Sequence, residues 1–415
     1  MKKVSRLLLI TILITALFSG TVFASATNLK ITIDGSTKTL TAQLKEGRNF
    51  VAGSSLKSLG LDYSLNQNTA ILKNKEVEFR FTLNTNKVKV NNTDFTLDSK
   101  SYKNGHEAYL PLRFILETLG YNVSWDKSTN GIKATKQNKI TYPVTIENNG
   151  VKYTVSKEPS TIVSLAPDVT ETLFAIGAGN KVKGRTQYCN YPTQVSAIKN
   201  VGSMTDPSIE TIVDINPELV IAATHYKEEV LKKLETAKIA IVVKDSPKTL
   251  EEMYADILKL GAIVNRNYEA RALVSSMKSK VETVKMYTNS IKNKPTAYYV
   301  VGTGQYGEYT AGKDTFVAEL IRVAGGINAA DDVTGWNYSL EKLIDKNPDI
   351  IFGAQWDYDT MTTSPNYKGL KAIKNNKFKV VNVDIFSRPS ARAIDEGLKI
   401  LVEIFHKDTA KKLSF

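Results

Sequence analysis

The stretch SIETIVDINPELVI at residues 208–221 returns as SLEKLIDKNPDIIF at residues 339–352. Each copy begins with a serine suited to cap a helix, places a glutamate in the first turn, and ends the helix at Asn-Pro before an aliphatic run. This order predicts the same short helix and buried strand at two places in the chain. The repeat therefore indicates two related halves.

Short aliphatic strands alternate with helical segments around both copies, which is typical of a mainly parallel α/β sheet. The first half contains TIVSLAP (161–167), PELVIAA (217–223) and IAIVV (239–243). The second half contains TAYYVVG (296–302), PDIIFGA (348–354) and KVVNVD (379–384). We expect one α/β lobe at residues 159–265 and another at residues 293–415.

Residues 266–292 are expected to form one helix that joins the lobes. Within them, apolar residues fall at helical spacing without an interrupting glycine or proline: Leu273, Met277, Val281, Val284 and Ile291. Two lobes joined in this way leave a cleft, and clefts between domains commonly bind small ligands. The predicted fold class is a two-lobed α/β binding protein preceded by a small α+β repeat domain.

The first 26 of the 415 residues have the pattern of a secretory leader. The basic start MKKVSR precedes the apolar run LLLITILITALF, and small residues lead to a predicted cleavage site near Ala26. Cys189 is the only cysteine and lies far from that site, so a lipid-modified cysteine is not expected. We expect an exported protein, extracellular or associated with the cell wall, that is not a lipoprotein.

Charge and motifs narrow the classes of partner. The formal net charge is +13, and without the three basic residues of the leader it is about +10, which suits an anionic wall polymer or membrane surface. No RNA-binding motif or zinc-finger spacing is present, so nucleic acid is not expected. The glycine-rich residues 302–313 lack the GK[ST] ending of a phosphate loop, and only three histidines occur. We therefore expect no enzyme activity, no metal site and no cofactor.

Residues 27–136 contain a second internal repeat. Residues 49–72 match residues 108–132, and each half predicts a short helix, a glycine that ends it, and an alternating strand. The segment YLPLRFILETLGYNVSWDKSTNGI (109–132) resembles the copper amine oxidase N-terminal-like domain of secreted bacterial proteins. A lone histidine, His106, does not support copper binding. We interpret this domain as a spacer or wall-contacting stalk, followed by a polar joint at residues 137–158.

The rest of the chain resembles another family. Residues 141–192 and 201–222 are similar to substrate-binding proteins of ABC importers for iron siderophores, haem and cobalamin. QYCNYP (187–192), residues 309–332 and DIFSRPSARAIDEGLKIL (384–401) are most similar to the cobalamin branch. The resemblance implies capture of cobalamin or a related corrinoid for an importer. Haem and ferric siderophores remain alternatives, and a structural wall or adhesion protein is the alternative from another class.

The resemblance also implies where the ligand and the permease subunits bind. The ligand is expected on loops at the strand ends of both lobes, where large aromatic groups suit a macrocycle and an arginine suits its polar edge. One acid on each lobe, Glu210 and Glu341, is expected to dock on the permease, although both acids also suit a helix start. The predicted ligand-binding residues are Tyr188, Met204, His225, Tyr226, Tyr306, Trp336, Tyr338, Trp356, Tyr358, Phe386 and Arg388.

Overall fold

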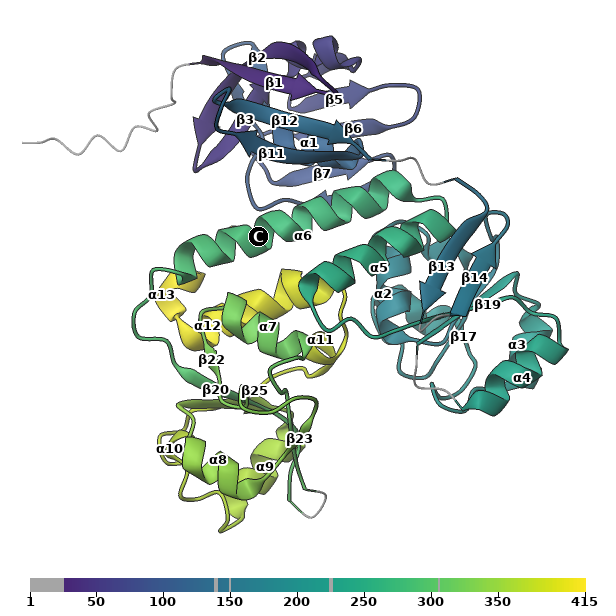
Figure 1. Cartoon of the computed structure of the whole chain (residues 1–415), viewed down its shortest axis with the longest axis vertical. Coiled ribbons are helices and arrows are strands. Elements are labelled where there is room, and N and C mark those ends of the chain that lie inside the picture. Colours follow the sequence, from purple (N-terminus) through teal and green to yellow (C-terminus); the bar gives the residue numbers. More distant parts are fainter. Residues whose placement is uncertain (1–25, 138–140, 149–150, 224–226, 305–306) are drawn as a thin grey trace, which may run out of the picture.

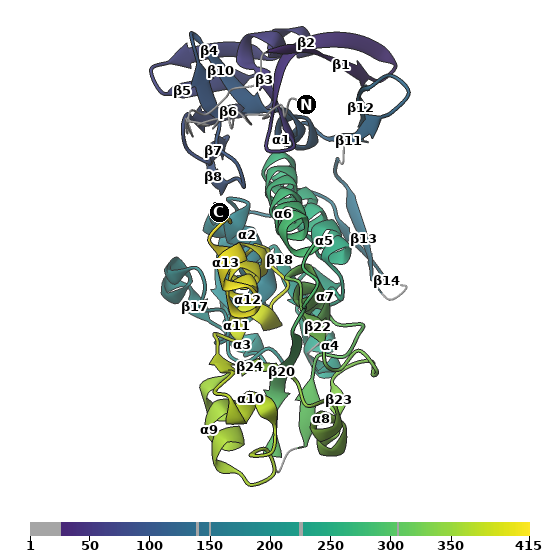
Figure 2. The same ribbon diagram turned by 90° about the vertical axis from the view of Figure 1, so that its left-hand side faces the viewer.

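The computed structural model describes residues 26–137, 141–148, 151–223, 227–304 and 307–415. Figure 1 shows a β-rich stalk at one end of the molecule, a long helix beneath it, and two α/β lobes on the other side of that helix. Figure 2 shows the same order from a perpendicular direction. Within the described residues, no helix combines the length and the apolar character that a membrane span requires.

The stalk consists of two sheets around two short helices. Its seven-stranded sheet has the order β11-β12-β1-β2-β3-β10-β9, and its five-stranded sheet has the order β4-β5-β6-β7-β8. Asp34 (φ 46°) and Gly35 (φ 86°) close the first hairpin in the left-handed conformation that such tight turns require. The elements are β1 (Thr27–Ile33), β2 (Ser36–Lys45), β3 (Arg48–Ala52), η1 (Gly53–Leu59), β4 (Asp62–Asn66), β5 (Thr69–Lys73), β6 (Glu78–Thr82), β7 (Lys87–Val90), β8 (Thr93–Thr96), β9 (Tyr102–Asn104), β10 (Glu107–Pro111), α1 (Leu112–Thr118), β11 (Tyr121–Asp126) and β12 (Gly131–Lys136).

The N-terminal lobe (N-lobe) is built on a parallel sheet of order β17-β16-β15-β18-β19, as expected from the alternating pattern. A hairpin of β13 and β14 precedes this sheet. The elements are β13 (Val144–Asn148), β14 (Val151–Val155), β15 (Ile162–Ser164), α2 (Pro167–Ala175), η2 (Gly179–Lys181), β16 (Val182–Arg185), η3 (Thr193–Ala197), β17 (Lys199–Asn200), α3 (Ile209–Ile215), β18 (Leu219–Ala223), α4 (Glu228–Thr236), β19 (Ile241–Lys244) and α5 (Leu250–Ile263).

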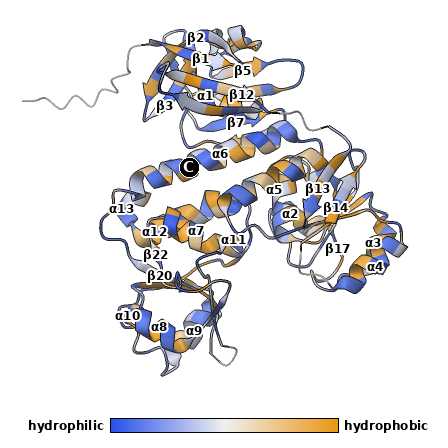
Figure 3. Cartoon of the chain, viewed as in Figure 1, coloured by the Kyte–Doolittle hydropathy of each residue, from blue (hydrophilic) through white to orange (hydrophobic). Residues whose placement is uncertain are grey.

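The C-terminal lobe (C-lobe) has a mixed sheet. Strands β20, β22, β24 and β25 are parallel, whereas β21 and β23 extend the sheet in antiparallel pairs. Figure 3 shows hydrophobic residues concentrated on its central strands and on α12. The elements are β20 (Thr296–Gly302), β21 (Glu308–Thr310), α7 (Phe316–Val323), β22 (Ile327–Asn328), β23 (Asn337–Tyr338), α8 (Leu340–Lys346), β24 (Ile350–Gly353), α9 (Gln355–Thr363), α10 (Lys371–Lys374), β25 (Phe378–Val380), α11 (Asp384–Ser387), the π-helix η5 (Ala393–Gly397), α12 (Leu398–Phe405) and α13 (Lys407–Ala410).

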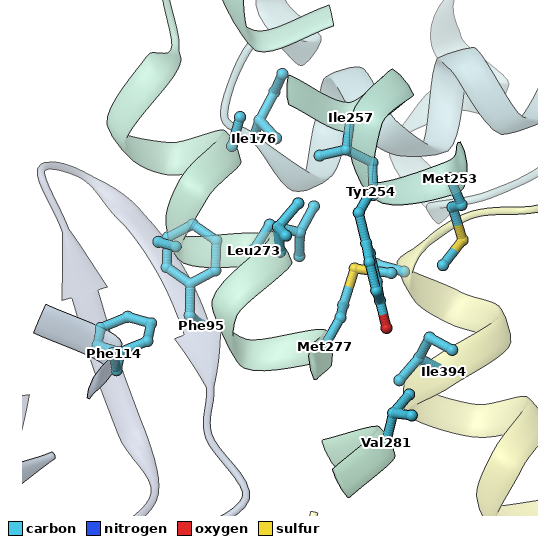
Figure 4. Close-up of a cluster of buried hydrophobic side chains, with 14 of the residues drawn as sticks. Phe95, Phe114, Ile176, Met253, Tyr254, Ile257, Leu273, Met277, Val281 and Ile394 are labelled. Carbon is cyan, nitrogen blue, oxygen red and sulfur yellow. The ribbon is translucent and has the colours of Figure 1, made fainter. Parts of the chain in front are cut away.

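Helix α6 (Asn267–Thr288) joins the lobes, as its apolar spacing predicts. It also packs against the stalk. Figure 4 shows Phe95 and Phe114 of the stalk on one side of α6, and Tyr254 and Ile394 of the two lobes on the other. Met277 between them is fully buried, and a single apolar cluster continues from the stalk through α6 into both lobes. The three units therefore share one core.

Polar contacts reinforce this packing. Ser275 donates a hydrogen bond to Glu117 of α1 at 2.5 Å, and Ser276 donates one to the carbonyl oxygen of Thr96 at 2.8 Å. Arg113 forms two hydrogen bonds with Glu282, at 2.9 and 2.7 Å. The sequence indicates only a polar joint between the stalk and the lobes, whereas the structure shows a broad contact along α6.

Arg48 contributes to this contact toward the C-terminal end of α6. It pairs with the buried Asp98 and reaches Thr283 of α6, whose hydroxyl donates to Asp98 at 2.7 Å. Ser414, near the C-terminus, donates to the carbonyl oxygen of Asp98 at 2.9 Å. This cluster ties the stalk to the helix and to the end of the C-lobe.

A second buried cluster joins the lobes to each other. The Arg388 guanidinium donates to Glu171 at 3.1 Å, to Asn190 at 2.6 Å and to the carbonyl oxygen of Tyr188 at 3.0 Å. Ser390 donates to the other Glu171 oxygen at 2.6 Å. Burial raises the pKa of the Glu171 carboxyl, and the paired arginines counteract this rise. The network crosses from α2 of the N-lobe to the segment that follows α11.

Replacement of Arg48 tests the contact between the stalk and α6. Arg48→Ala leaves Asp98 without its guanidinium partner, and we expect a loss of about 2 kcal/mol in the free energy of unfolding, because a buried carboxylate then lacks its counter-charge. Urea denaturation measures this loss. Lys89→Ala is the control, because its pair with Asp94 is exposed and is worth less than about 1 kcal/mol. Equal midpoints for both variants would refute a stabilising role for Arg48.

Replacement of Arg388 in the interlobe network should lower the free energy of unfolding more than replacement of Arg48. Arg388→Ala leaves Glu171, which is only 5% exposed, as a buried charge with weakened compensation. We expect a loss of about 3 kcal/mol, relieved in part by a second change, Glu171→Gln, which removes that charge. The matched control is Arg322→Ala, whose pair with Asp331 is largely exposed. A stability loss no greater than that of the control would contradict this assignment.

Candidate functional site

The sequence repeat forms equivalent helix starts in the two lobes. The Ser208 hydroxyl accepts from the backbone N–H of Thr211 at 3.2 Å in α3, and the Ser339 hydroxyl accepts from that of Lys342 at 3.2 Å in α8. Asn216 (φ 50°) and Asn347 (φ 42°) end the helices in the left-handed conformation. The predicted caps and helix ends are therefore confirmed in both copies.

Glu210 and Glu341 lie exposed in the first turns of α3 and α8. Hydrogen bonding from its own backbone N–H, and then from Ser339, holds the pKa of the Glu341 carboxyl below its usual value, so this group carries a charge at neutral pH. In both views, α3 and α8 lie on the side of the lobes away from the stalk (Figures 1 and 2). The two matched helices thus lie on the same side of the molecule.

The predicted N-lobe ligand residues have different environments. Tyr188, in the segment after β16, exposes 45% of its surface, and Met204 is half-buried. Tyr188 is brought against the C-lobe, because its carbonyl oxygen accepts from Arg388. His225 and Tyr226 lie outside the described residues, as does Tyr306 of the C-lobe.

Three aromatic residues of the C-lobe stay accessible near strand ends. Trp336 precedes β23 and is 44% exposed, and Trp356 follows β24 and is 62% exposed. Tyr358 is 37% exposed, with its ring 5.4 Å from that of Phe378. We expected Trp356 and Tyr358 on a loop, but both lie in the first turns of α9, because this helix begins almost directly after the buried strand.

Three other predicted residues are packed rather than open. Tyr338 is half-buried, with its hydroxyl 3.3 Å from the carbonyl oxygen of Ala329, and burial raises its pKa. Phe386 is 1% exposed, in α11 instead of a loop, with its ring 5.7 Å from that of Phe352. Arg388 is 7% exposed within the interlobe network. In this arrangement, Phe386 packs within the C-lobe, whereas Arg388 supports the junction of the lobes.

Several residues that the sequence analysis did not single out lie beside the predicted site residues. Asn190 donates a hydrogen bond to Asp384 across the lobes at 2.8 Å. The Arg392 guanidinium lies over the Tyr191 ring, with its central carbon 4.3 Å from the ring centre. The sequence could have indicated them, because all four fall within the QYCNYP and DIFSRPSAR segments that carry the family resemblance. Asp357, beside Trp356, was also missed. It is 1% exposed, and burial raises the pKa of its carboxyl.

Cys189 and His106 lie in different environments. Cys189 is buried and accepts a hydrogen bond from Thr170 at 3.2 Å. His106 lies exposed in the stalk between β9 and β10. No cluster of three or more His, Cys, Asp or Glu side chains suited to a metal occurs among the described residues.

Two cavities border the lobes away from the exposed aromatic residues. One of about 620 Å³ lies between β13, the end of β19 and α5, and includes Lys244, which pairs with Asp168 at 2.8 Å. Another of about 350 Å³ lies where β8, α2, α6 and η5 meet. The predicted ligand residues that the structure describes line neither cavity. Tyr188, Trp336 and Trp356 instead lie on open surface, suited to a broad, flat and largely apolar ligand.

Comparisons with known families agree with this architecture. Residues 162–383 match the family described as Periplasmic binding protein. Residues 32–134 match the Copper amine oxidase N-terminal domain. The two matches correspond to the lobes and to the stalk.

Individual relatives cover the lobes. The chain is 31% identical to the "Uncharacterized ABC transporter substrate-binding lipoprotein YvrC" of Bacillus subtilis, over 67% of this chain and 90% of that protein. It is 24% identical to a "Cobalamin-binding protein" of Halobacterium salinarum, over 65% of this chain and 75% of that protein. The solved apo structure of the periplasmic haem-binding protein RhuT from Roseiflexus is similar in fold, with a TM-score of 0.55, 22% identity, and coverage of 60% of this chain and 99% of that one.

These relatives are solute-binding proteins rather than enzymes. The chain belongs to the periplasmic binding protein family, as a substrate-binding protein of the group that serves ABC importers of iron siderophores, haem and cobalamin, with a copper amine oxidase N-terminal domain in front of its two lobes.

Proposed function

We propose that this protein captures cobalamin or a related corrinoid between its lobes and delivers it to an ABC importer. The exposed indoles of Trp336 and Trp356, at strand ends of the C-lobe, carry this proposal. Aromatic surfaces of this size stack on a macrocycle and lose little conformational freedom on binding. The cobalamin-binding relative supports the same ligand class.

Haem is the competing ligand, because the fold is also that of a haem-binding protein. Haem iron generally requires an axial His, Tyr, Met or Cys ligand. Met204 is half-buried and Tyr188 is exposed, whereas His225 and Tyr226 lie outside the described residues. A ferric siderophore would need accessible arginines, yet Arg388 is occupied by Glu171 and Asn190. These contacts favour a corrinoid over a siderophore.

Delivery requires a surface that the permease subunits recognise. Glu210 and Glu341 give each lobe one exposed carboxylate at the start of a matched helix, and charge pairs at a contact rim favour encounter and correct orientation. We propose that these acids meet basic residues on the importer. We also propose export without a lipid anchor, since the sole cysteine, Cys189, is buried in the N-lobe. In this respect the protein would differ from its B. subtilis relative, which is called a lipoprotein.

Ligand titration tests the corrinoid assignment. Residues 27–415 should bind cyanocobalamin one-to-one in calorimetry, and Trp336→Ala or Trp356→Ala should weaken binding by about tenfold or more, because each removes a stacking surface. Trp125→Ala, in the stalk, should leave cyanocobalamin affinity unchanged. Haemin is titrated in parallel. Binding of haemin without cyanocobalamin would overturn the corrinoid assignment in favour of haem.

If Glu210 and Glu341 dock on the permease, replacing them should reduce transport without reducing ligand binding. Replacing Glu210 and Glu341 together with Gln should leave the melting temperature and corrinoid affinity nearly unchanged, while uptake falls by about tenfold, because each contact loses its counter-charge. The control pair is Glu229→Gln with Glu403→Gln, which removes exposed acids from α4 and α12. Normal uptake with a lowered melting temperature would show that both glutamates have only a structural role.

A further inference from the structure

A groove between the stalk and α6 lies apart from the residues proposed for corrinoid binding. Its volume is about 560 Å³. The turn after β2, strand β11 and the start of α1 form its stalk side, and α6 contributes Ser279 and Glu282. The groove therefore lies at the contact between the stalk and this helix.

One wall of the groove is apolar and accessible. Trp125 on β11 exposes 50% of its surface, and Leu44 at the end of β2 exposes 60%. Val123 lies two residues before Trp125, on the same face of the strand. Beneath them, Leu112 and Phe114 are buried and form a closed floor. An indole face beside small aliphatic groups is thus available to a ligand.

The opposite rim is polar and balanced in charge. Arg113 forms two hydrogen bonds with Glu282, and these side chains are 43% and 56% exposed. Arg48 is likewise neutralised by Asp98. Asn49 adds a neutral hydrogen-bonding group to this rim, and Ser124 adds another beside Trp125 on β11. Two arginines facing two acids do not select an ion of either sign, so the rim suits a neutral ligand rich in hydroxyl or amide groups.

We propose that this groove binds a glycan built of neutral N-acetylated amino sugars. The apolar face of a sugar ring stacks on Trp125, the acetamido methyl group packs against Leu44 and Val123, and the ring hydroxyls meet Arg113, Glu282 and Asn49. A purely apolar ligand would leave the paired charges of the rim desolvated without compensation. An anionic polymer would find no net positive charge at this rim, although the whole chain is basic.

The position of the groove is compatible with transport. The stalk and α6 lie on the side of the lobes opposite α3 and α8, so a glycan in the groove does not cover the proposed docking helices (Figures 1 and 2). Contacts from Trp125 on one side and Glu282 on the other would bind the glycan to both the stalk and the helix that joins the lobes.

Oligosaccharide titration of residues 27–415 tests the inference. The probes are an N-acetylglucosamine tetramer, a neutral glucose tetramer and poly(glycerol phosphate), and binding is followed by tryptophan fluorescence and calorimetry. We expect the N-acetylglucosamine tetramer alone to bind. Preference for poly(glycerol phosphate), equal binding of the glucose tetramer, or binding of none of the three would overturn the proposal.

Point variants in the groove, with a tryptophan outside it as control, locate the binding. Trp125→Ala should weaken N-acetylglucosamine tetramer binding by about tenfold or more, and Trp125→Phe should retain part of it, because a smaller aromatic face remains. Glu282→Gln, which preserves shape, should also weaken it. Trp336→Ala should leave it unchanged. Unchanged affinity in a folded Trp125→Ala protein would refute this site, whereas the cyanocobalamin titration decides the corrinoid assignment independently.

Discussion

The structure depends on the burial of α6 from two sides. Met277 is fully buried and Val281 is 5% exposed, because the stalk covers one side of the helix and the lobes cover the other (Figure 4). A helix that only bridged two lobes would leave one long face in water, and its sequence would carry a wide polar stripe there. The stalk instead covers this face of α6, where Ser275 and Ser276 are buried and donate hydrogen bonds to Glu117 and to the carbonyl oxygen of Thr96.

Local sequence patterns predicted these helices well, because the residues that start and end a helix lie within the helix or next to it. Serine caps, acids in the first turn and asparagine ends identify α3 and α8, and uninterrupted apolar spacing identifies α6. The same reasoning misplaced Trp356 on a loop. The polar segment after β24 contains no strong N-cap residue, yet it forms α9, where Asp357 accepts from the backbone N–H of Ala354 at 3.3 Å.

Contacts between distant segments could not be read from the sequence. Arg48 and Thr283 belong to different domains, and neither lies in a motif that indicates a partner. Arg388 looked like a ligand contact because it follows a strand in a distinctive segment. The structure shows that Glu171, more than two hundred residues earlier in the chain, determines its environment. Residue type and spacing identify chemistry, but tertiary packing decides whether that chemistry faces a ligand or another side chain.

The two buried clusters also constrain how the lobes can move. A bend within α6 would break the hydrogen bonds of Ser275, Ser276 and Thr283 with the stalk, so this helix is held straight by more than its own backbone. Arg388 and Glu171 cross between the lobes close to α6, where a rotation produces little displacement. Helix α9, which carries Trp356, and strand β23, which follows Trp336, lie farther from α6 (Figure 1). A rotation of one lobe about this region would therefore displace α9 and β23 more than it would displace the buried network, and it would leave the contacts of the stalk with α6 in place.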